Sequence, residues 1–404
     1  MAHVFRARWL IPAEGPILED AALVAEGGRI VRIGPWASLK AHVGAGDTVE
    51  HFPDAALLPG LVNAHTHLSL SDMRGKFRPT KNFAAWIAKL AARRQLRTQA
   101  SMRRTVEAGA RECREAGTVA GADLTLDTPL DDHLGRDAAR WVVFSEVLRF
   151  GDSGRERLRQ AIAEAEALGR AGLIRPGLSP HAPYTLSADL FVEVRRAADA
   201  RGWPVSTHLH ETQDEIAFVE RGEGSLHSWL SLLQFLPRDW RPAGVRPIRM
   251  LADAGFFSGP VLVGHANYLT DDEIAILAAS GSSVAFCPRS HAFFKHADHP
   301  WRRLLAAGVN VCLGTDSLAS CPSLSVLDEA KFLFAQGGAD PQLLLAMATR
   351  RGARALGLED VTGDLREGLA AEFCIAEPAA GTNEPLAAIL AGESGPVRLV
   401  VPHN

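Results

Sequence analysis

Short runs of apolar residues alternate with helix-length segments through the middle of the chain. Turn-forming residues separate one run from the next, and this pattern predicts βα units that build a parallel sheet. Eight runs have the length and composition of buried strands, and eight parallel strands close a (β/α)8 barrel. The predicted strands are Leu61–Ala64, Val119–Ala122, Trp141–Phe144, Leu173–Leu178, Pro204–Thr207, Val261–Val263, Ser283–Phe286 and Val309–Gly314.

Three of the intervening segments carry clear helix signals. They are Gln160–Leu168, Ala188–Ala200 and Asp271–Ala279. The last begins after Thr270, a residue type that caps helix N-termini. The fold class is therefore predicted to be α/β.

The two ends of the chain have a different pattern, with short strands separated by glycine, proline and acidic turns. We expect one small β domain formed from residues 1–59 and 359–404, with the barrel, residues 60–358, inserted between its halves. The strands predicted for this domain are Val4–Ile11, Ala21–Ala25, Arg29–Ile33, Ala56–Leu58, Leu369–Ile375 and Val397–Val401.

Polar residues that can bind a metal or a proton follow several of the central strands. Because the carboxyl ends of barrel strands meet at one rim, where the active sites of such barrels lie, these side chains are expected to converge. They are His65 and His67 after the first strand, His181 after the fourth, His208 after the fifth, His265 after the sixth and Asp316 after the eighth.

His65 and His67 alternate along one strand, so they face the same side and can bind one ion together. With His208 and Asp316 they form an N/N/N/O set suited to Zn(II) or Fe(II), with one position open for water. His210 is a rival ligand, because it shares a face with His208 in an ideal strand. We prefer His208, which lies nearer the end of the strand.

Proton transfer needs further residues. A metal lowers the pKa of bound water, but removal of an amino group also requires a group that moves protons to the leaving amine. Glu211, three residues after His208, is the predicted proton shuttle, although an ordinary acidic helix start would have the same sequence. Asp316 is expected to take another proton while it contacts the metal, and His265 to orient the attacking water or polarise the substrate.

Composition limits the partners. The 404 residues carry 43 Lys+Arg and 47 Asp+Glu, so no net basic field exists to bind nucleic acid or an anionic membrane. No run approaches the ~20 apolar residues of a membrane span. The five cysteines form no C-x-x-C pair, which argues against a disulfide framework and a thiolate zinc site. We expect a cytoplasmic protein that acts on a small molecule.

Several motifs occur in order along the chain. They are Pro59-Gly60-Leu61-Val62-Asn63-Ala64-His65-Thr66-His67, His181-Ala182-Pro183-Tyr184-Thr185, His208-x-x-Glu211-Thr212, Gly264-His265, Gly314-Thr315-Asp316-Ser317 and the tail segment from Gly363 to Phe373. With these motifs the chain resembles the amidohydrolase superfamily, in its branch of cytosine-deaminase-like and triazine-hydrolase-like aminohydrolases. The resemblance covers nearly the whole chain.

The resemblance implies a metal-centred (β/α)8 barrel with a β-sandwich built from both termini. It implies the metal ligands His65, His67, His208 and Asp316, catalytic Glu211, His265 and Asp316, and substrate binding by His181. Binuclear members use a carboxylated lysine at the end of the fourth strand, where this chain has His181 and no nearby lysine. One divalent metal ion is therefore expected, zinc in preference to iron.

The substrate is suggested by three stretches, Ser69–Asp72, Phe83–Ile87 and Cys287–Ser290, which look most like the aminofutalosine-deaminase-like members. Those enzymes hydrolyse the 6-amino group of a modified adenosine. The resemblance thus implies hydrolytic deamination of an amino-substituted N-heterocycle, an adenosine-like nucleoside or purine base, with release of ammonia. Ser69 stands where many relatives carry an acidic residue and His291 where Asn is common, so these positions bear on purine recognition.

Other candidates keep two interpretations. Phe83 and Trp86 are either an aromatic wall for a flat heterocycle or the buried face of a helix, and their i, i+3 spacing favours the core. Arg149, after the third strand, either binds a substrate carboxylate or pairs with a neighbouring acid. His291, His296 and His299 form either a second ion site or a solvated loop, and we expect the loop.

Two alternatives to deamination stay open. A chlorohydrolase or cyclic-amide hydrolase of the same superfamily would use the same residues, and a barrel without catalysis would serve as a binding or scaffold protein. The intact set of His65, His67, His208, Glu211 and Asp316 counts against the scaffold. Family habit suggests a homo-oligomer.

Overall fold

The computed structural model describes residues 1–126, 134, 139–170 and 174–402. The chain divides into two compact units. The first comprises Met1–Ala64, Arg111–Gly121 and Ser325–Asn404, and the second comprises His65–Ala110 and Ala122–Leu324.

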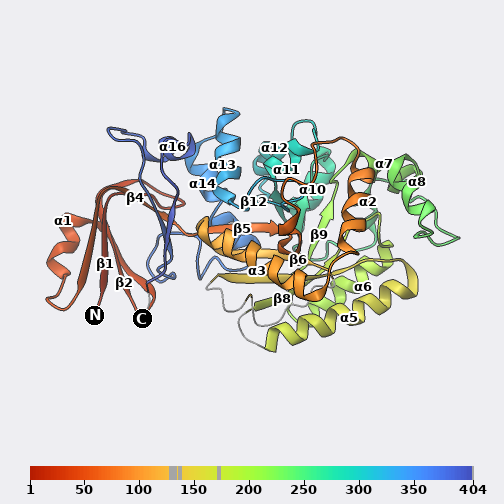
Figure 1. The fold of residues 1–404 in the computed structure, drawn as a ribbon, viewed down its shortest axis with the longest axis horizontal. Helices are drawn as coiled ribbons and strands as arrows, with labels where there is room; N and C mark the ends of the chain where they lie inside the picture. Colours follow the sequence, from red (N-terminus) through yellow and green to blue (C-terminus); the bar gives the residue numbers. More distant parts are fainter. Residues whose placement is uncertain (127–133, 135–138, 171–173, 403–404) are drawn as a thin grey trace. The chain divides into compact units, whose positions relative to one another are not determined.

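A six-stranded sheet lies within the first unit, and Figure 1 labels three of its strands, β1, β2 and β4. The strand order is β14-β13-β4-β1-β2-β3. β1 pairs antiparallel with β2 and parallel with β4, and β13 pairs antiparallel with β4. Alternate side chains, among them Phe5, Leu23, Leu57 and Phe373, pack in one apolar core. The two ends of the chain therefore share one sheet, whose strands are β1 (His3–Leu10), β2 (Leu18–Glu26), β3 (Arg29–Pro35), β4 (Thr48–Pro59), β13 (Phe373–Ala376) and β14 (Arg398–Val400).

The central strands form two four-stranded sheets with the orders β5-β6-β7-β8 and β9-β10-β11-β12. The pairs β7–β8, β9–β10, β10–β11 and β11–β12 are parallel. All residues of β5, β6 and β9 to β12 are buried, as in parallel sheets covered on both faces. The strands are β5 (Leu61–Thr66), β6 (Thr118–Thr125), β7 (Arg140–Val147), β8 (Ile174–Pro180), β9 (Ser206–Leu209), β10 (Leu262–His265), β11 (Ser283–Phe286) and β12 (Asn310–Leu313).

Two isolated parallel pairings lie between these sheets. Leu178 of β8 pairs with Val205, which precedes β9, and Thr66 of β5 pairs with Asp316, which follows β12. The outer strands of one sheet therefore contact the outer strands of the other at two places.

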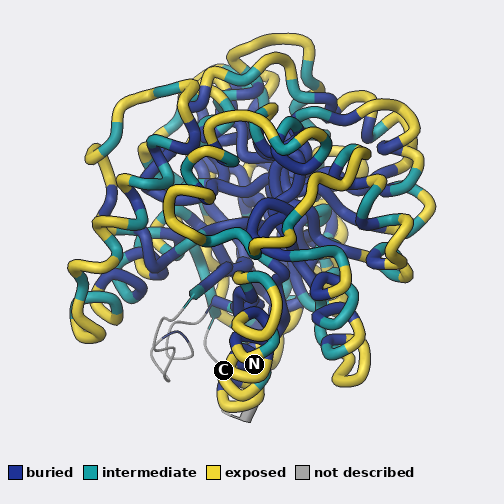
Figure 2. Tube along the Cα trace, turned by 90° about the vertical axis from the view of Figure 1, so that its right-hand side faces the viewer, coloured by how far each residue is buried: buried dark blue, intermediate teal, exposed yellow. Residues whose placement is uncertain are grey.

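Helices follow most of the strands, and in Figure 2 the buried positions gather in the interior of the trace while exposed positions lie on its outside. The helices of the second unit are α2 (Phe83–Arg94), α5 (Gly151–Arg170), α6 (Ala188–Asp199), α7 (Gln213–Arg221), α8 (Gly224–Leu232), α9 (Pro247–Asp253), α10 (Asp271–Ala279), α11 (Pro288–Phe293) and α12 (Trp301–Ala306). The first unit has α1 (Trp36–Leu39), α13 (Val326–Ala335), α14 (Pro341–Met347), α15 (Arg350–Ala355) and α16 (Pro385–Leu390), and α3 (Gln99–Glu115) belongs partly to each.

The α/β class predicted from the sequence is confirmed by this mixed content. The helix predicted at Asp271–Ala279 has the same bounds in the structure, because Thr270 and Glu273 form a capping box. The strand predicted at Ala56–Leu58 was too short, since β4 begins at Thr48, where polar residues pair with β1. Leu173 lies outside the described residues. Among those that are described, no helix combines the length and apolarity needed to cross a membrane.

Candidate active site

Three histidines meet where β5 and β9 end. His65 is the fifth residue of β5, His67 follows that strand directly, and His208 lies in β9. Each offers a ring nitrogen, and these nitrogens all lie within 4.8 Å of one another. His65 and His208 are only 0% and 4% exposed.

The hydrogen-bond partners of these rings determine which ring nitrogens are available to bind a metal ion. Nδ1 of His67 is 2.9 Å from the carbonyl oxygen of Leu124, and Nδ1 of His208 is 3.1 Å from that of His181. A carbonyl oxygen only accepts, so both Nδ1 atoms carry the hydrogen and both Nε2 atoms present a lone pair. These two Nε2 atoms are 3.1 Å apart. Two lone pairs repel at that distance, whereas a cation bound by both would attract them.

His65 supports the same interpretation. Neither of its ring nitrogens has a hydrogen-bond partner among the described residues, although both are buried. Burial lowers the pKa of His65 and of His208 well below the ordinary value, so both rings are neutral and free to bind a metal. The residues present thus fit a divalent metal ion.

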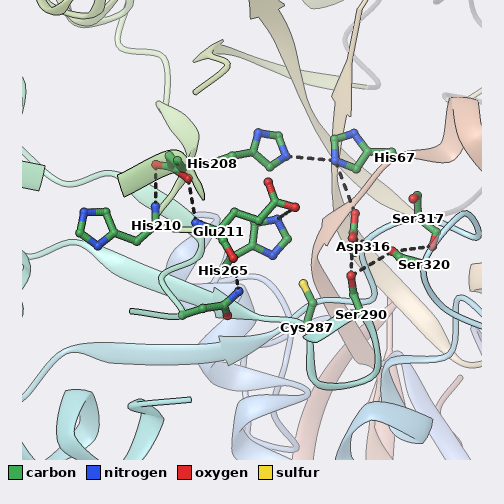
Figure 3. A network of polar contacts seen from close by, with 12 residues as sticks. His67, His208, His210, Glu211, His265, Cys287, Ser290, Asp316, Ser317 and Ser320 are labelled. Carbon is green, nitrogen blue, oxygen red and sulfur yellow. Dashed lines mark hydrogen bonds and ion pairs between the residues drawn. The ribbon is translucent and has the colours of Figure 1, made fainter. Parts of the chain in front are cut away.

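Asp316 completes the set from beyond β12. Its Oδ1 is 3.7 Å from Nε2 of His67. A dashed line joins the two residues in Figure 3. Its Oδ2 accepts hydrogen bonds from the hydroxyls of Ser290 and Ser320 at 2.6 and 2.7 Å. The backbone N–H of Asp316 donates to the carbonyl of His65 at 3.0 Å. The carboxylate is therefore held with one oxygen directed at the histidines.

Glu211 and His265 lie beside this group. Oε1 of Glu211 is 3.7 Å from Nε2 of His265, the last residue of β10 (Figure 3). Burial raises the pKa of Glu211 well above its ordinary value, and the charges of Asp316 and Glu215 raise it further. Burial lowers the pKa of His265 to about 4, although the charge of Asp316 opposes this change. Burial thus favours the protonated form of the Glu211 carboxyl group and the neutral form of the His265 imidazole.

Glu215 fixes the backbone that carries Glu211. Its carboxylate accepts the N–H groups of His210 and Glu211, each at 2.9 Å. Asn267 donates from Nδ2 to the carbonyl of Glu211 at 2.8 Å. The sequence analysis missed Glu215, although its place three residues after Thr212, the N-cap of α7, is a capping-box signal.

His210, the rival ligand, points away from the histidine group. Its Nδ1 donates to the carbonyl of Tyr268 at 2.8 Å, and its Nε2 accepts the N–H of Ile248 at 3.3 Å. His210 has a backbone φ of 52°, so the alternation of side chains along β9 does not continue to it. Its buried ring therefore points away from the other three histidines. The structure thus places His208, and not His210, with His65 and His67.

Left-handed backbone recurs at the strand ends that carry the site. His265, Ala266 and Asp316 have φ values of 70°, 54° and 59°. Non-glycine residues adopt such angles at a cost, typically where function requires a particular side-chain direction. Two of these residues, His265 and Asp316, are ones that the sequence analysis assigned to catalysis.

The matching protein family follows from comparison with known proteins. The model of the amidohydrolase family matches residues 56–400 of the chain. This chain belongs to the amidohydrolase family. The family predicted from the ordered motifs is thereby confirmed.

Curated relatives of this amidohydrolase are deaminases by name. It is 30% identical over 391 residues to 5-methylthioadenosine/S-adenosylhomocysteine deaminase of Moorella thermoacetica, covering 91% of this chain and 84% of that protein. It is 32% identical over 319 residues to aminodeoxyfutalosine deaminase of Deinococcus radiodurans, covering 75% and 74% of the two chains.

Solved structures share the fold. An adenosine deaminase of Xanthomonas campestris with bound zinc has a TM-score of 0.83 and 26% identity, covering 99% of this chain and 91% of that one. Aminofutalosine deaminase of Helicobacter pylori in complex with methylthio-coformycin has a TM-score of 0.87 at 21% identity, covering 99% and 98%. The latter likeness concerns the fold alone.

Three of the residues predicted to bind the substrate have different surroundings in the amidohydrolase. The ring of His181 lies 5.0 Å from that of His208, centroid to centroid. The guanidinium of Arg149 lies 4.6 Å from the ring centroid of Phe235, so it packs over an aromatic ring. Ser69 is 2% exposed, and its carbonyl accepts a hydrogen bond from Arg97.

Phe83 and Trp86 both belong to an apolar cluster of the amidohydrolase. Phe83 lies 5.5 Å and Trp86 5.0 Å from the ring of Phe294, and both side chains are buried. Phe83 also lines a cavity of about 830 Å³, together with Tyr268 and His296. The core interpretation of these two aromatics therefore describes their packing, and Phe83 in addition reaches a cavity.

The histidines after β11 do not form the solvated loop that we expected. The ring of His299 stacks on Phe286 at 3.8 Å, and Tyr268 and His296 share a hydrogen bond of 2.7 Å. Burial lowers the pKa of His291 to about 4 and that of His296 and His299 to about 3. Among the described residues, these three do not form a group with metal-ligand spacing. They are neutral packing groups.

Two buried acids of the amidohydrolase were also missed. Oε1 of Glu146 lies 3.8 Å from Nδ1 of His208, and Glu146 forms a second close group with His181 and His208. Asp123 accepts the N–H of Leu68 at 2.8 Å, and burial raises its pKa to about 8. Asp123 directly follows the predicted strand Val119–Ala122, and Glu146 lies two residues after the predicted strand Trp141–Phe144. The strand-end rule that selected His181 and His208 could therefore have found both acids.

Proposed function

We propose that this amidohydrolase is a metal-dependent hydrolytic deaminase of adenosine-like substrates, which releases ammonia. The observation that carries the proposal is the set of His65, His67 and His208 with Asp316, placed beside the buried carboxyl group of Glu211, whose pKa is raised well above its ordinary value by burial. The names of the curated relatives support the same reaction and substrate class.

The fold that we propose for the site is a closed (β/α)8 barrel, with a β-sandwich built from both termini. The pairings Leu178–Val205 and Thr66–Asp316 support closure, because they link the two four-stranded sheets at both ends of the strand order. The boundaries we propose remain residues 1–59 and 359–404 for the β domain and 60–358 for the barrel.

His65, His67, His208 and Asp316 would hold the metal, as one divalent ion with zinc preferred over iron. When bound, such an ion lowers the pKa of water so that water attacks at neutral pH. The zinc in the structurally similar adenosine deaminase supports this preference.

The chain's own residues would move the protons. Glu211 would donate its proton to the ring nitrogen beside the amine-bearing carbon, while water adds to that carbon. His265, neutral at this pH, would accept a hydrogen bond from the attacking water. Asp316 would accept one proton of the attacking water and pass it to the amine. As the C–N bond breaks and ammonia leaves, the proton of the added hydroxyl would return to Glu211, which restores its carboxyl group. The products are ammonia and the ring carbonyl compound, so atoms and charge balance.

His181, Phe83, Trp86, Arg149 and Ser69 remain our candidates for substrate binding. The ring of His181 supports this assignment by its position next to His208. Phe83 does so by lining a cavity. A homo-oligomer, a cytoplasmic location and the absence of nucleic-acid and membrane partners likewise remain predictions.

The test is a panel of adenosine, 5′-deoxyadenosine, 5′-methylthioadenosine, S-adenosylhomocysteine, adenine, guanine and cytosine, assayed for ammonia on protein of measured metal content. Ammonia from the adenosine-like members is expected. Chloride from a chlorinated triazine, or a ring-opened acid from a cyclic amide, would favour the alternative hydrolases. Protein without bound metal and without turnover would favour the scaffold.

A further inference from the structure

The carboxylate of Asp316 has two oxygens in different environments. Its Oδ1 lies 3.7 Å from Nε2 of His67. Its Oδ2 lies 2.6 Å from the hydroxyl of Ser290 and 2.7 Å from the hydroxyl of Ser320, and Figure 3 shows both contacts. All three side chains are buried, with residue exposures of 5%, 1% and 3% for Asp316, Ser290 and Ser320.

The direction of these hydrogen bonds can be worked out from the number of protons. Each hydroxyl has one hydrogen, and the two serine oxygens are also 2.9 Å apart. Both hydroxyl groups are placed as donors to Oδ2, and a carboxylate oxygen that carries no hydrogen only accepts. Both hydroxyls therefore donate to Oδ2, and the contact between Ser290 and Ser320 is one of two oxygens drawn to the same acceptor.

We infer that Ser290 and Ser320 are positioning residues that make Asp316 a one-oxygen metal ligand. A carboxylate oxygen has two lone-pair directions, and the two hydroxyls occupy both of those on Oδ2. Only Oδ1 remains for the ion. Binding through a single oxygen suits the small coordination number of zinc, whereas calcium commonly takes both oxygens of a carboxylate.

The backbone around the pair is fixed independently of the carboxylate. Ser290 lies in α11 and Ser320 in the segment after β12, and Arg289 links the two by donating to the carbonyl and hydroxyl of Ser323, each at 2.9 Å. The N–H of Asp316 is bound to the carbonyl of His65. Removal of one hydroxyl therefore changes the partners of Oδ2 and leaves these contacts of the chain in place. The Ser320 hydroxyl has one further contact, at 3.3 Å from the carbonyl of Ser317.

The inference rests on the proposed function for the identity of the ion but can be tested without substrate. Zinc affinity would be measured by competition with a chromophoric chelator for S290A, S320A and the double variant. Partners of this kind typically change metal affinity 10–100-fold, so we expect each single variant to bind zinc about tenfold more weakly and the double variant about 100-fold more weakly. The melting temperature of each metal-free protein should stay that of the metal-free wild type.

Ser317 provides the matched control. It is a buried serine next to Asp316 whose hydroxyl has no hydrogen-bond partner among the described residues. S317A should keep wild-type zinc affinity. Zinc affinities of S290A, S320A and the double variant equal to that of S317A would overturn the inference. So would a fall in metal-free melting temperature that accounts for the weaker binding.

A kinetic measurement separates this inference from the proposed function. At saturating zinc, the double variant should lose kcat while KM stays unchanged, because neither serine is assigned to the substrate. If no nucleoside in the panel yields ammonia but the zinc affinities change as expected, the proposed function fails and the inference stands.

Discussion

Replacement of Glu211 by glutamine is the sharpest perturbation of the proposed mechanism. The glutamine side chain has the same shape, so it fills the same buried position, where Glu211 is 6% exposed. It cannot give up a proton to the substrate. We therefore expect E211Q to bind metal as the wild type does and to lose the contribution of general acid–base catalysis.

The size of the loss follows from the position of the carboxyl group. Oε1 of Glu211 is 3.7 Å from Nε2 of His265, and burial raises the pKa of Glu211 well above its ordinary value, which favours the proton-carrying form. Positioned proton transfer typically contributes about 10²–10⁴-fold, so kcat should fall by that factor. This corresponds to about 2.7–5.4 kcal/mol in activation free energy.

Stability separates this effect from misfolding. A carboxyl group whose pKa is raised by folding stabilises the protein below its unfolded pKa, and this stabilisation is lost as the pH rises through the folded value. Ionisation of the buried Glu211 therefore adds no stability to the wild type. The metal-free E211Q protein should melt no lower than the metal-free wild type.

The assay is ammonia release at saturating substrate and zinc, with elemental analysis of the same samples. E166Q is the control, since Glu166 is an exposed partner of Arg201 in the same unit. It should keep wild-type kcat. Turnover of E211Q near the wild-type rate, with metal retained, would refute the assignment of Glu211 as the proton donor.

Three further predictions concern the site and its surroundings. In G314A the new Cβ would lie 2.9 Å from backbone atoms of His65, which cannot move aside, so circular dichroism should find this variant unfolded. In G264A the new Cβ would lie 2.8 Å from the ring of His65, so this variant should fold but displace the ring and bind little metal. Folding lowers the pKa of His299 to about 3, so the stability that depends on its neutral form is present above pH 6.5 and is lost as the pH falls. The wild type should therefore lose about 1.4 kcal/mol of unfolding free energy at pH 5.5. In urea denaturation, H299Q should lose less unfolding free energy than the wild type over the same pH range. Removal of metal with a chelator should lower the melting temperature, and zinc at ~1,000 times its dissociation constant should restore about 4 kcal/mol of unfolding free energy. Equal melting temperatures of the chelated and the reloaded protein would contradict this prediction.

Local signals in the sequence were sufficient where a structure depends on neighbouring residues. Thr270 and Glu273 lie three residues apart and cap α10 reciprocally, so the predicted helix has the observed bounds. The metal residues could also be predicted, because strand alternation and the strand-end rule depend on chain direction alone. His65, His67, His208 and Asp316 were selected in this way, and they lie together in the structure.

Residues distant in the sequence determine the features that the sequence analysis did not predict. The polar half of β4 is a strand because it pairs with β1, and nothing within residues 48–55 indicates this pairing. The three histidines after β11 are neutral because Phe286 and Tyr268 cover them. Such burial depends on chain segments that only folding brings together.

The sequence by itself thus determined the α/β class, the family and the residues that we propose for the chemistry, because these depend on residue type and on order along strands. The tertiary structure agrees with the preference for His208 over His210, since His210 has a positive φ and its ring nitrogens bind other partners. It alone placed Glu215 under Glu211, and Ser290 and Ser320 on one oxygen of Asp316. The physical reason is that a side chain's direction and protonation depend on the atoms around it, and those atoms come from distant parts of the chain.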